Sequence, residues 1–237
     1  MNQPKTALIT GASQGLGFAF AQALATQGWN LLINARNASR LLEAQRALAE
    51  HTTVVAISGD VRDEIHLLQL ADALKRHAWS LDLVVNNASS LGAPLQSLLE
   101  QPIENLHTVL HTNMIAPVSL LQKVRPYLKD GAKIVNVSSD AAAEAYPTWG
   151  AYGGSKAGLD HLTAVLNEEY TAYTFYSFDP GDMRTEMHQA AFPDEDISDR
   201  PLPSEAAVPA LLTLVEQPVP GGRHTIQSLK EYAYETQ

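Results

Sequence analysis

Short apolar runs alternate with longer amphipathic segments along the chain. The runs expected to form strands cover residues 7–10, 30–34, 54–58, 83–86, 133–137 and 174–179, and a weaker seventh run covers 224–227. Several of these runs are continuously apolar instead of alternating with polar residues, which is typical of parallel strands buried on both faces.

The intervals between the runs carry the periodicity of amphipathic helices. Helices are expected at 15–28, 39–51, 63–77, 103–128, 151–170 and 204–216. Ser39 is expected to cap the second helix, Asp63 to begin the third, and Pro117 to kink the fourth. Regular alternation of strand and helix implies right-handed crossovers between parallel strands. The pattern therefore predicts a single α/β domain over residues 1–237, with a Rossmann-type doubly wound parallel sheet of about seven strands and helices on both faces.

One segment departs from this alternation, at residues 186–203. It holds three prolines and five acidic residues, which are Pro193, Pro201, Pro203, Glu186, Asp194, Glu195, Asp196 and Asp199. It follows the carboxyl end of the sixth strand, where an open α/β sheet places its ligand crevice. Two interpretations stay open for such a long loop: a mobile flap over a site, or a surface loop with no such role.

Composition narrows the classes of partner and compartment. The 237 residues include 26 acidic and 16 basic side chains, for a formal net charge of −10. Such a chain repels nucleic-acid phosphates and anionic lipid, so neither nucleic acid nor a membrane is expected as a partner. There is no cysteine, which excludes disulfides, thiolate zinc sites and cysteine nucleophiles. With no apolar leader and no run of about 18 apolar residues, a cytoplasmic protein is expected.

The first strand leads into a glycine-rich turn, TGASQGLG, before the first helix. Gly11, Gly15 and Gly17 allow the backbone to turn tightly and to approach a pyrophosphate, and the following helix offers free N–H groups to it. A position between a strand and a helix is the context that a dinucleotide site requires. The alternative is a tight turn that binds no ligand.

The end of the second strand indicates which dinucleotide would bind. An acidic residue here would hold the ribose 2′-hydroxyl of NAD, but Ala35 stands there, followed by Arg36 and, one helical turn later, Arg40. An arginine attracts a 2′-phosphate that an acid would repel. NADP(H) is therefore favoured over NAD(H). The alternative is that both arginines are solvated surface charges.

The stretch SSDAAAEAYPTWGAYGGSK holds the strongest chemical signal. Tyr152 and Lys156 are four residues apart and share one face of a helix. An ammonium beside a phenol favours the phenolate, so the pKa of Tyr152 is expected to fall below its usual value of about 10. Ser139, at the end of the fifth strand, can polarise a substrate carbonyl. Taken alone, a Tyr–Lys pair at this spacing is more often a surface pair.

The order of these motifs resembles that of the short-chain dehydrogenases/reductases. TGxxxGxG, NNA at residues 86–88, Asn113, Ser139, YxxxK, and PG at Pro180 and Gly181 follow one another over residues 10–185. The glycine spacing and length are similar to those of the short-subunit branch. The resemblance implies an NADP(H)-dependent oxidoreductase that interconverts a carbonyl and an alcohol by hydride transfer, acting on a small-molecule substrate.

The resemblance also implies a role for each matched catalytic residue. Tyr152 would exchange a proton with the substrate oxygen. Lys156 would lower the pKa of Tyr152 and hold the nicotinamide ribose. Ser139 would orient the carbonyl, and Asn113 would hold a water in a proton relay.

The expected cofactor contacts extend from the glycine turn to the segment after the sixth strand. They are Gly11, Ser13, Gly15, Leu16, Arg36, Asp60, Val61, Asn86, Ala88, Tyr152, Lys156, Pro180, Gly181, Met183 and Thr185. In the family, the matching positions after the third and fourth strands meet the adenosine half, and those after the sixth bracket the nicotinamide.

Two features depart from the family pattern. Ser89 stands after NNA, where the family often has glycine, and residues 218–237 lack the glycine-rich ending common in the family. The resemblance implies a homodimer or a homotetramer, and the atypical ending leaves open which of the two forms.

Other side chains allow more than one interpretation. His107 and His111 are four residues apart, but no third ligand is evident, so no metal is expected. The large apolar side chains near the expected site could form a substrate wall or be ordinary core and loop residues; they are Tyr146, Trp149, Met187 and Phe192.

A second function stays open beside the enzyme. A nonenzymatic dinucleotide-binding sensor or scaffold on the same fold would explain the glycines and Arg36 equally well. It would not explain why the four expected catalytic residues are all present, because cofactor binding needs fewer of them.

Overall fold

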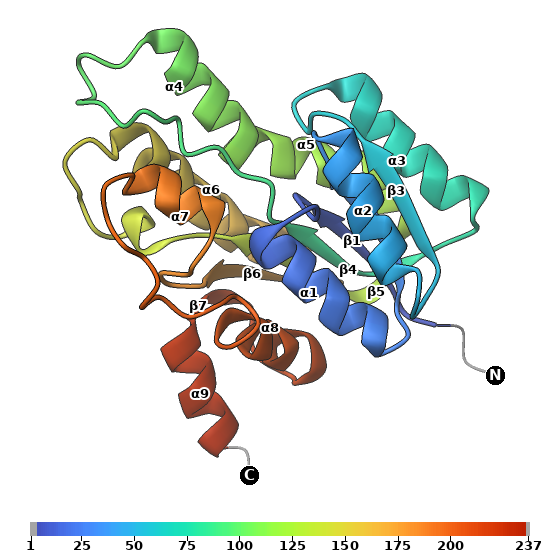
Figure 1. Cartoon of the computed structure of the whole chain (residues 1–237). Helices are drawn as coiled ribbons and strands as arrows, with labels where there is room; N and C mark the ends of the chain where they lie inside the picture. The colour runs from blue at the N-terminus through green and yellow to red at the C-terminus, as the bar shows by residue number, and fades with distance from the viewer. Residues whose placement is uncertain (1–3, 236–237) are drawn as a thin grey trace.

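The centre of the molecule is a sheet of seven parallel strands in a computed structural model that describes residues 4–235 (Figure 1). Residues 1–3 and 236–237 of the expected domain lie outside the described part. The strands are β1 (Thr6–Thr10), β2 (Asn30–Ala35), β3 (Val54–Ser58), β4 (Leu81–Asn86), β5 (Leu128–Val137), β6 (Thr174–Asp179) and β7 (Gly222–Thr225). Their order across the sheet is β3-β2-β1-β4-β5-β6-β7, so the predicted α/β fold with a Rossmann-type sheet is confirmed.

The inner strands are buried on both faces because their apolar residues are continuous. Along β1, Ala7 and Ile9 pack into one layer of the core and Leu8 packs into the other. All three side chains have no exposed surface. Two-sided burial of this kind requires a helical layer on each face of the sheet.

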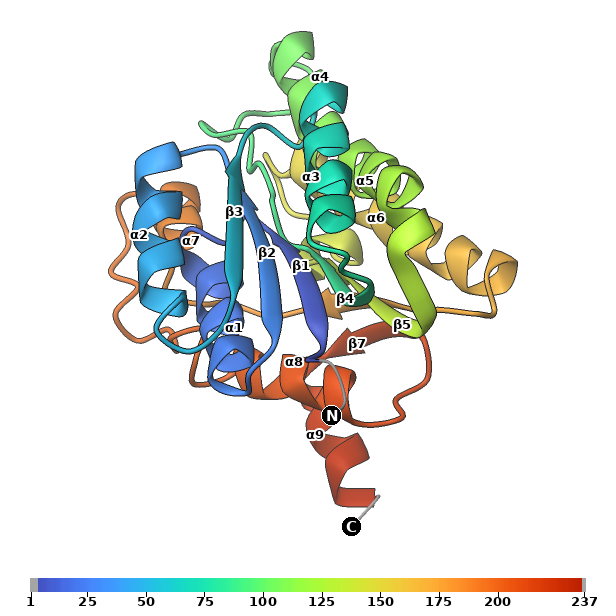
Figure 2. The same ribbon diagram turned by 90° about the vertical axis from the view of Figure 1, so that its right-hand side faces the viewer.

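Helices form these two layers (Figure 2). One face is covered by α1 (Gly15–Thr26), α2 (Ala38–Leu48) and α8 (Ala207–Glu216), whose buried side chains share one apolar cluster. The other face is covered by α3 (Glu64–Arg76) and α5 (Ala116–Val124), which share the second cluster, and by α6 (Gly150–Glu169). The remaining helices are α4 (Ile103–Leu110), α7 (Glu186–Ala191) and α9 (Ile226–Glu235), of which α9 adds Leu229 to the first cluster.

The chain reverses its direction across the sheet between β1 and β4. The first three strands follow one another outward from β1, and the chain then returns to place β4 on the other side of β1. In an open α/β sheet, ligands bind at the carboxyl ends of the strands at such a switch point. The topology therefore places a crevice beside the glycine turn that follows β1.

The expected cap of the second helix is corrected by the structure. The helix begins at Ala38, and the side chain of Asn37 accepts a hydrogen bond from the Arg40 N–H at 3.0 Å. Asn37 is as good a cap as Ser39 and stands two residues earlier, so the helix starts there. The expected start of the third helix at Asp63 is confirmed, because its side chain accepts from the Ile65 N–H.

The long helix expected over residues 103–128 is also corrected. It is divided into α4, a π-helical turn over His111–Ile115, α5, and a short 3-10 turn over Arg125–Tyr127. Pro117 lies in the first turn of α5 and does not kink a continuous helix. A proline has no N–H to donate four residues back, so the regular hydrogen-bond ladder cannot continue through this point, and the wider turn lies just before it.

The C-terminal part differs most from the expected pattern. The seventh strand covers Gly222–Thr225, so it begins two residues earlier than the expected start at residue 224. The helix α9 already begins at Ile226, within the range expected to be a strand. The segment after β6 contains α7, where the sequence predicted only a loop. None of the helices among residues 4–235 is long and apolar enough to cross a membrane.

Candidate active site

A cleft of about 1010 Å³ opens at the carboxyl ends of the strands. Six strands contribute the residues that follow them, from the glycine turn after β1 to Pro180 after β6. The flap segment, defined as residues 186–203, contributes α7 and the residues around Leu202. Sites for small molecules and cofactors commonly measure about 300–1,000 Å³. A cleft at the upper end of that range can hold a ligand larger than a single small substrate.

The glycine turn has a backbone that other residues could not adopt. Gly11 and Gly15 have φ values of +65° and +57°, in the left-handed region. A Cβ on Gly11 would lie 2.8 Å from Asn87 Nδ2, and a Cβ on Gly17 would overlap the same atom and the Gly11 carbonyl. Asn87 holds the turn by donating to the carbonyls of Thr10 and Gly11. Glycine is therefore required here by conformation and by close packing.

The residues around this turn fit a bound pyrophosphate. The helix α1 begins after Gln14 without a side-chain cap. Its first N–H groups are thus free to bind an anion at the positive end of the helix. No acidic residue stands in its first turn, so nothing there opposes a negative ligand.

Two arginines lie at the end of the cleft near β2. Arg36 lines the cleft, is exposed, and makes no hydrogen bond or ion pair with any other residue from 4 to 235. Arg40 forms an ion pair with Glu186 of α7 at 2.8 Å. Gln14 donates to Glu186 at 3.1 Å and accepts from Arg40. Arg36 is thus available to a 2′-phosphate, whereas Arg40 already has a carboxylate partner.

Asp60 is held in its charged form at the same end of the cleft. It accepts hydrogen bonds from Arg62, including one from Nη2 at 2.7 Å. These bonds keep the pKa of Asp60 below its ordinary value, against the opposing effect of burial, and the charge of Arg36 adds to the lowering. Asp60 and Val61 both line the cleft beside the two arginines.

Tyr152 and Lys156 lie on one face of α6 at the inner end of the cleft. Their exposed fractions are 8% and 2%. Lys156 Nζ lies 5.5 Å from the centre of the Tyr152 ring and donates to the Val137 carbonyl at 2.7 Å. Ser139 follows the end of β5 and lines the same part of the cleft. The three side chains expected to act on the substrate are therefore gathered at one place.

The pKa of Tyr152 shifts in the direction opposite to the one expected. Burial raises the pKa of Tyr152 to about 12, although the hydroxyls of Ser139 and Ser89 oppose the rise. Burial also lowers the pKa of Lys156 to about 8, against the charge of Asp160. The spacing of the two residues predicts a lowered pKa for Tyr152; in the structure, desolvation of the phenol is the largest influence and raises it.

The hydroxyl of Ser139 is already engaged by its neighbour. It donates to Asp140 Oδ1 at 2.8 Å, and Tyr146 donates to the other oxygen of that carboxylate at 2.9 Å. Asp140 was not among the expected site residues. Its carboxylate also raises the pKa of Tyr152, although less than burial does.

Two expected residues do not line the cleft. Asn86 is buried and donates to Asn136 at 2.7 Å, while its neighbour Asn87 takes the place in the cleft wall. Asn113 is buried in the π-helical turn, where it donates to the Ser90 carbonyl and accepts from the Ser89 hydroxyl. The departure from the family at Ser89 thus supplies a contact to Asn113.

Aromatic side chains pack around Tyr152. Trp149 packs edge-on against Tyr152 at 5.6 Å between ring centres, and against Phe192 of the flap segment at 5.8 Å. The ring centre of Tyr146 lies 6.3 Å from that of Trp149. Of the apolar residues with two open interpretations, Trp149 and Met187 line the cleft.

The other expected residues fall on the cleft wall. They are Gly11, Ser13, Gly15, Leu16, Arg36, Asp60, Val61, Ala88, Ser139, Tyr152, Lys156, Pro180, Gly181, Met183 and Thr185. His107 and His111 lie on α4 and at the start of the π-helical turn, and no three side chains able to bind a metal gather among the described residues.

Comparison with known proteins identifies the family. A family model described as short chain dehydrogenase matches residues 5–196. The chain therefore belongs to the short-chain dehydrogenase/reductase family and is an oxidoreductase of that family. The sulfoacetaldehyde reductase 2 of Chromohalobacter salexigens is 35% identical to it over 162 residues, which cover 67% of this chain and 64% of that protein.

Solved structures match the fold over nearly the whole chain. A short chain dehydrogenase structure from Shigella flexneri 2a, complexed with NADP, has a TM-score of 0.88 at 28% identity and covers 94% of this chain and 97% of its own. One from Escherichia coli CFT073, complexed with NADPH, has a TM-score of 0.86 at 27% identity and covers 94% and 96%. Related structures of this fold thus bind NADP(H).

Proposed function

We propose that this protein is an NADPH-dependent reductase that converts a small-molecule carbonyl compound to an alcohol. The observation that carries the proposal is the convergence of Tyr152, Lys156 and Ser139 at the inner end of a cleft whose other end carries Arg36. A sensor or scaffold would need the glycine turn and the arginine, but not a buried tyrosine and lysine beside a serine.

The cofactor assignment is supported by the donors along the cleft. The uncapped start of α1 and the turn at Gly11 suit a pyrophosphate, and Arg36 suits a 2′-phosphate. The chemistry that NADPH supplies when bound is a hydride for the carbonyl carbon. The segment from Pro180 to Thr185 would enclose the nicotinamide end.

The protein residues act on the oxygen of the carbonyl. Tyr152 donates its proton to that oxygen as the alcohol forms, and the ammonium of Lys156 stabilises the phenolate that is left. Ser139 orients the carbonyl from the end of β5. Asn113 acts from behind the cleft wall, where its bonds to Ser89 and Ser90 hold the loop beside Tyr152.

The proton on Tyr152 suits the proposed carbonyl reduction. With a pKa of about 12, this phenol is protonated at neutral pH, and a protonated tyrosine is the form that carbonyl reduction requires. Alcohol oxidation would require the phenolate, which burial disfavours. The similarity to an aldehyde reductase and the apolar wall at Trp149 support an aldehyde or ketone substrate with an apolar part.

Tyr152→Phe tests the proposal. The variant should lose nearly all NADPH oxidation with a panel of aldehydes, ketones, diketones and quinones, by about 100-fold or more, because a general acid typically contributes about 10²–10⁴-fold. NADPH affinity, measured by fluorescence titration, should stay within about twofold because the ring is retained. Tyr173→Phe, remote from the cleft, is the matched control. Substantial turnover by Tyr152→Phe would refute the assignment, and tight NADPH binding by an inactive wild type would favour the sensor.

Arg36→Ala tests the choice of cofactor. The variant should bind NADPH more weakly by about 1.5–3 kcal/mol, as expected for a lost charge-assisted hydrogen bond, and should bind NADH unchanged. Arg46→Ala, in the last turn of α2, removes an equal charge as the control. Titration of all three proteins with both cofactors gives the comparison. An equal loss for NADPH and NADH would show that Arg36 does not contact the 2′-phosphate.

A further inference from the structure

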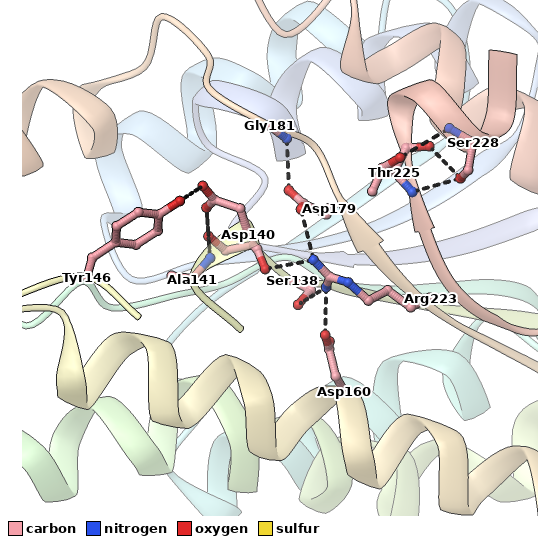
Figure 3. Close-up of polar contacts among 11 residues, drawn as sticks. Ser138, Asp140, Ala141, Tyr146, Asp160, Asp179, Gly181, Arg223, Thr225 and Ser228 are labelled. Carbon is pink, nitrogen blue, oxygen red and sulfur yellow. Dashed lines mark hydrogen bonds and ion pairs between the residues drawn. The ribbon is translucent and has the colours of Figure 1, made fainter. Parts of the chain in front are cut away.

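One arginine on the last strand joins four elements behind the cleft wall (Figure 3). Arg223 of β7 donates from Nη1 to Asp160 Oδ2 at 2.6 Å and to Ser138 Oγ at 3.1 Å. It donates from Nη2 to Asp179 Oδ2 at 2.9 Å and to the Ser139 carbonyl at 3.0 Å. A planar guanidinium can bind several oxygens in fixed directions, which a lysine cannot do.

Two of these contacts lead directly to residues of the proposed site. The bond to the Ser139 carbonyl fixes the peptide group next to the Cα that carries the serine side chain. The bond to Asp179 fixes a carboxylate whose other oxygen accepts the Gly181 N–H at 3.0 Å. Gly181 has a φ of +61°, so this turn after β6 is held in a specific conformation. Arg223 itself does not line the cleft.

The two carboxylates around Arg223 need its positive charge to lie so close together. The side chains of Asp179 and Asp160 are 9% and 17% exposed, and both form ion pairs with Arg223. Burial raises the pKa of Asp179, while the Gly181 N–H and the charge of Arg223 lower it. Without the guanidinium, two nearly buried carboxylates would face each other without a cation. The two carboxylates, on α6 and at the end of β6, would then have to move apart or take up a proton.

We propose that Arg223 is a positioning residue, which sets both the serine loop (residues 138–140) and the proline–glycine loop (residues 180–181) for catalysis. The inference rests on the proposed function, because it assigns the serine loop to the substrate and the proline–glycine loop to the nicotinamide. Arg223 contacts neither ligand and acts through Ser139 and Asp179. The sequence motifs did not single it out.

A binding comparison separates positioning from a general loss of structure. Arg223→Met should weaken NADPH binding by about tenfold, roughly the effect of one lost hydrogen bond between the proline–glycine loop and the nicotinamide end, and should leave 2′-phospho-ADP-ribose within about twofold. The fragment lacks the nicotinamide, so it does not contact the proline–glycine loop. Both values come from fluorescence titration, which requires no turnover. Equal weakening of both ligands, or no weakening of NADPH, would overturn the inference.

A kinetic comparison tests the contact to the serine. With p-nitrobenzaldehyde or phenanthrenequinone, whichever the wild type reduces, Arg223→Met should lower kcat by roughly 10- to 100-fold, as misplaced catalytic groups do. The same substitution in a Ser139→Ala background should change kcat by less than about twofold, because residues that act as a unit are not additive. Equal factors in the two backgrounds would overturn the inference, whereas an unimpaired Ser139→Ala single variant would overturn the role of Ser139 in the proposed function.

Two further variants keep the test interpretable. Lys133→Met removes a cation that holds the carbonyls of Leu214, Val215 and Gln217 at the other end of the sheet. It should lower the melting temperature and leave kcat and the ratio of the two dissociation constants unchanged. If Arg223→Met does not fold, Arg223→Lys keeps the charge without the planar fork, and the same two comparisons apply to it. A wild-type ratio and kcat in Arg223→Lys would contradict the role.

Discussion

Two buried titratable side chains set the protonation of the site at the scale of single residues. Tyr152 and Lys156 are both desolvated by the same packing, which raises the pKa of the phenol to about 12 and lowers that of the ammonium to about 8. Both shifts favour the neutral forms. Between about pH 8 and about pH 12, neither side chain is charged. Because the pKa of Lys156 is the lower of the two, Lys156 is the one that titrates near physiological pH.

The pH dependence of carbonyl reduction should therefore report Lys156. Below its pKa of about 8 the ammonium is present, and above it the charge that stabilises the phenolate is lost, so kcat should fall as the pH rises through about 8. Tyr152 stays protonated throughout this range and does not cause the fall. The charge of the arginine in Lys156→Arg persists above pH 8, so the pH–rate profile of this variant should not show the fall in kcat near pH 8. An unchanged fall in that variant would mean that another group titrates.

Local motifs predicted most residues of the cleft but not how neighbouring side chains share the polar contacts. The glycines, Ser139, Tyr152 and Lys156 are recognisable because a turn or a helix spacing fixes where each one lies. Asn86 and Asn87 show the limit: adjacent residues at the end of a strand point to opposite sides, and only the three-dimensional register decides which enters the cleft. The predicted direction of the Tyr152 pKa shift was wrong for a similar reason. The raised pKa comes from burial, which only the folded packing determines.

The flap segment shows what an element adds to the site. Its helix α7 is joined to the residue that caps α1 and to α2 through the contacts among Glu186, Gln14 and Arg40. Phe192, just after α7, packs on Trp149, which in turn packs on Tyr152. We propose that this segment is the flap over the bound ligands, and not an idle loop. The carboxylate of Glu186 pairs with Arg40, the second arginine at the end of the cleft where Arg36 lies.

Glu186→Gln should therefore strengthen the binding of NADPH. Removing the carboxylate frees Arg40 and removes a negative charge near the 2′-phosphate, and an exposed pair of this kind supports a change of about two- to fivefold in the dissociation constant. NADH should bind as before. Glu195→Gln, which removes a charge from the same segment beside Arg200, is the matched control. Weaker NADPH binding in Glu186→Gln would show instead that the contact holds the flap in its binding position.

The arrangement of the whole molecule was predictable where local patterns repeat and not where they fade. Continuous apolar runs separated by amphipathic helices define a doubly wound parallel sheet, and the switch between β1 and β4 then locates the cleft. The last part of the chain carries short, polar elements: β7 has only the residues Gly222–Thr225, none of them fully buried. Such a strand is defined by its pairing with β6 and not by its own pattern, so Arg223 could not be assigned from the sequence.

The place of Arg223 has a consequence for recombining members of this family. The match to the family model ends at residue 196, and the arginine lies beyond it, on the edge strand β7, which pairs with β6. A chimera joined at that boundary would inherit Ser139, Asp160 and Asp179 from one parent and the facing residue of β7 from the other. Unless the second parent also supplies a guanidinium there, two carboxylates would be left unbalanced beside the reaction centre. An exchange of C-terminal segments should therefore take β7, Asp160 and Asp179 from the same parent.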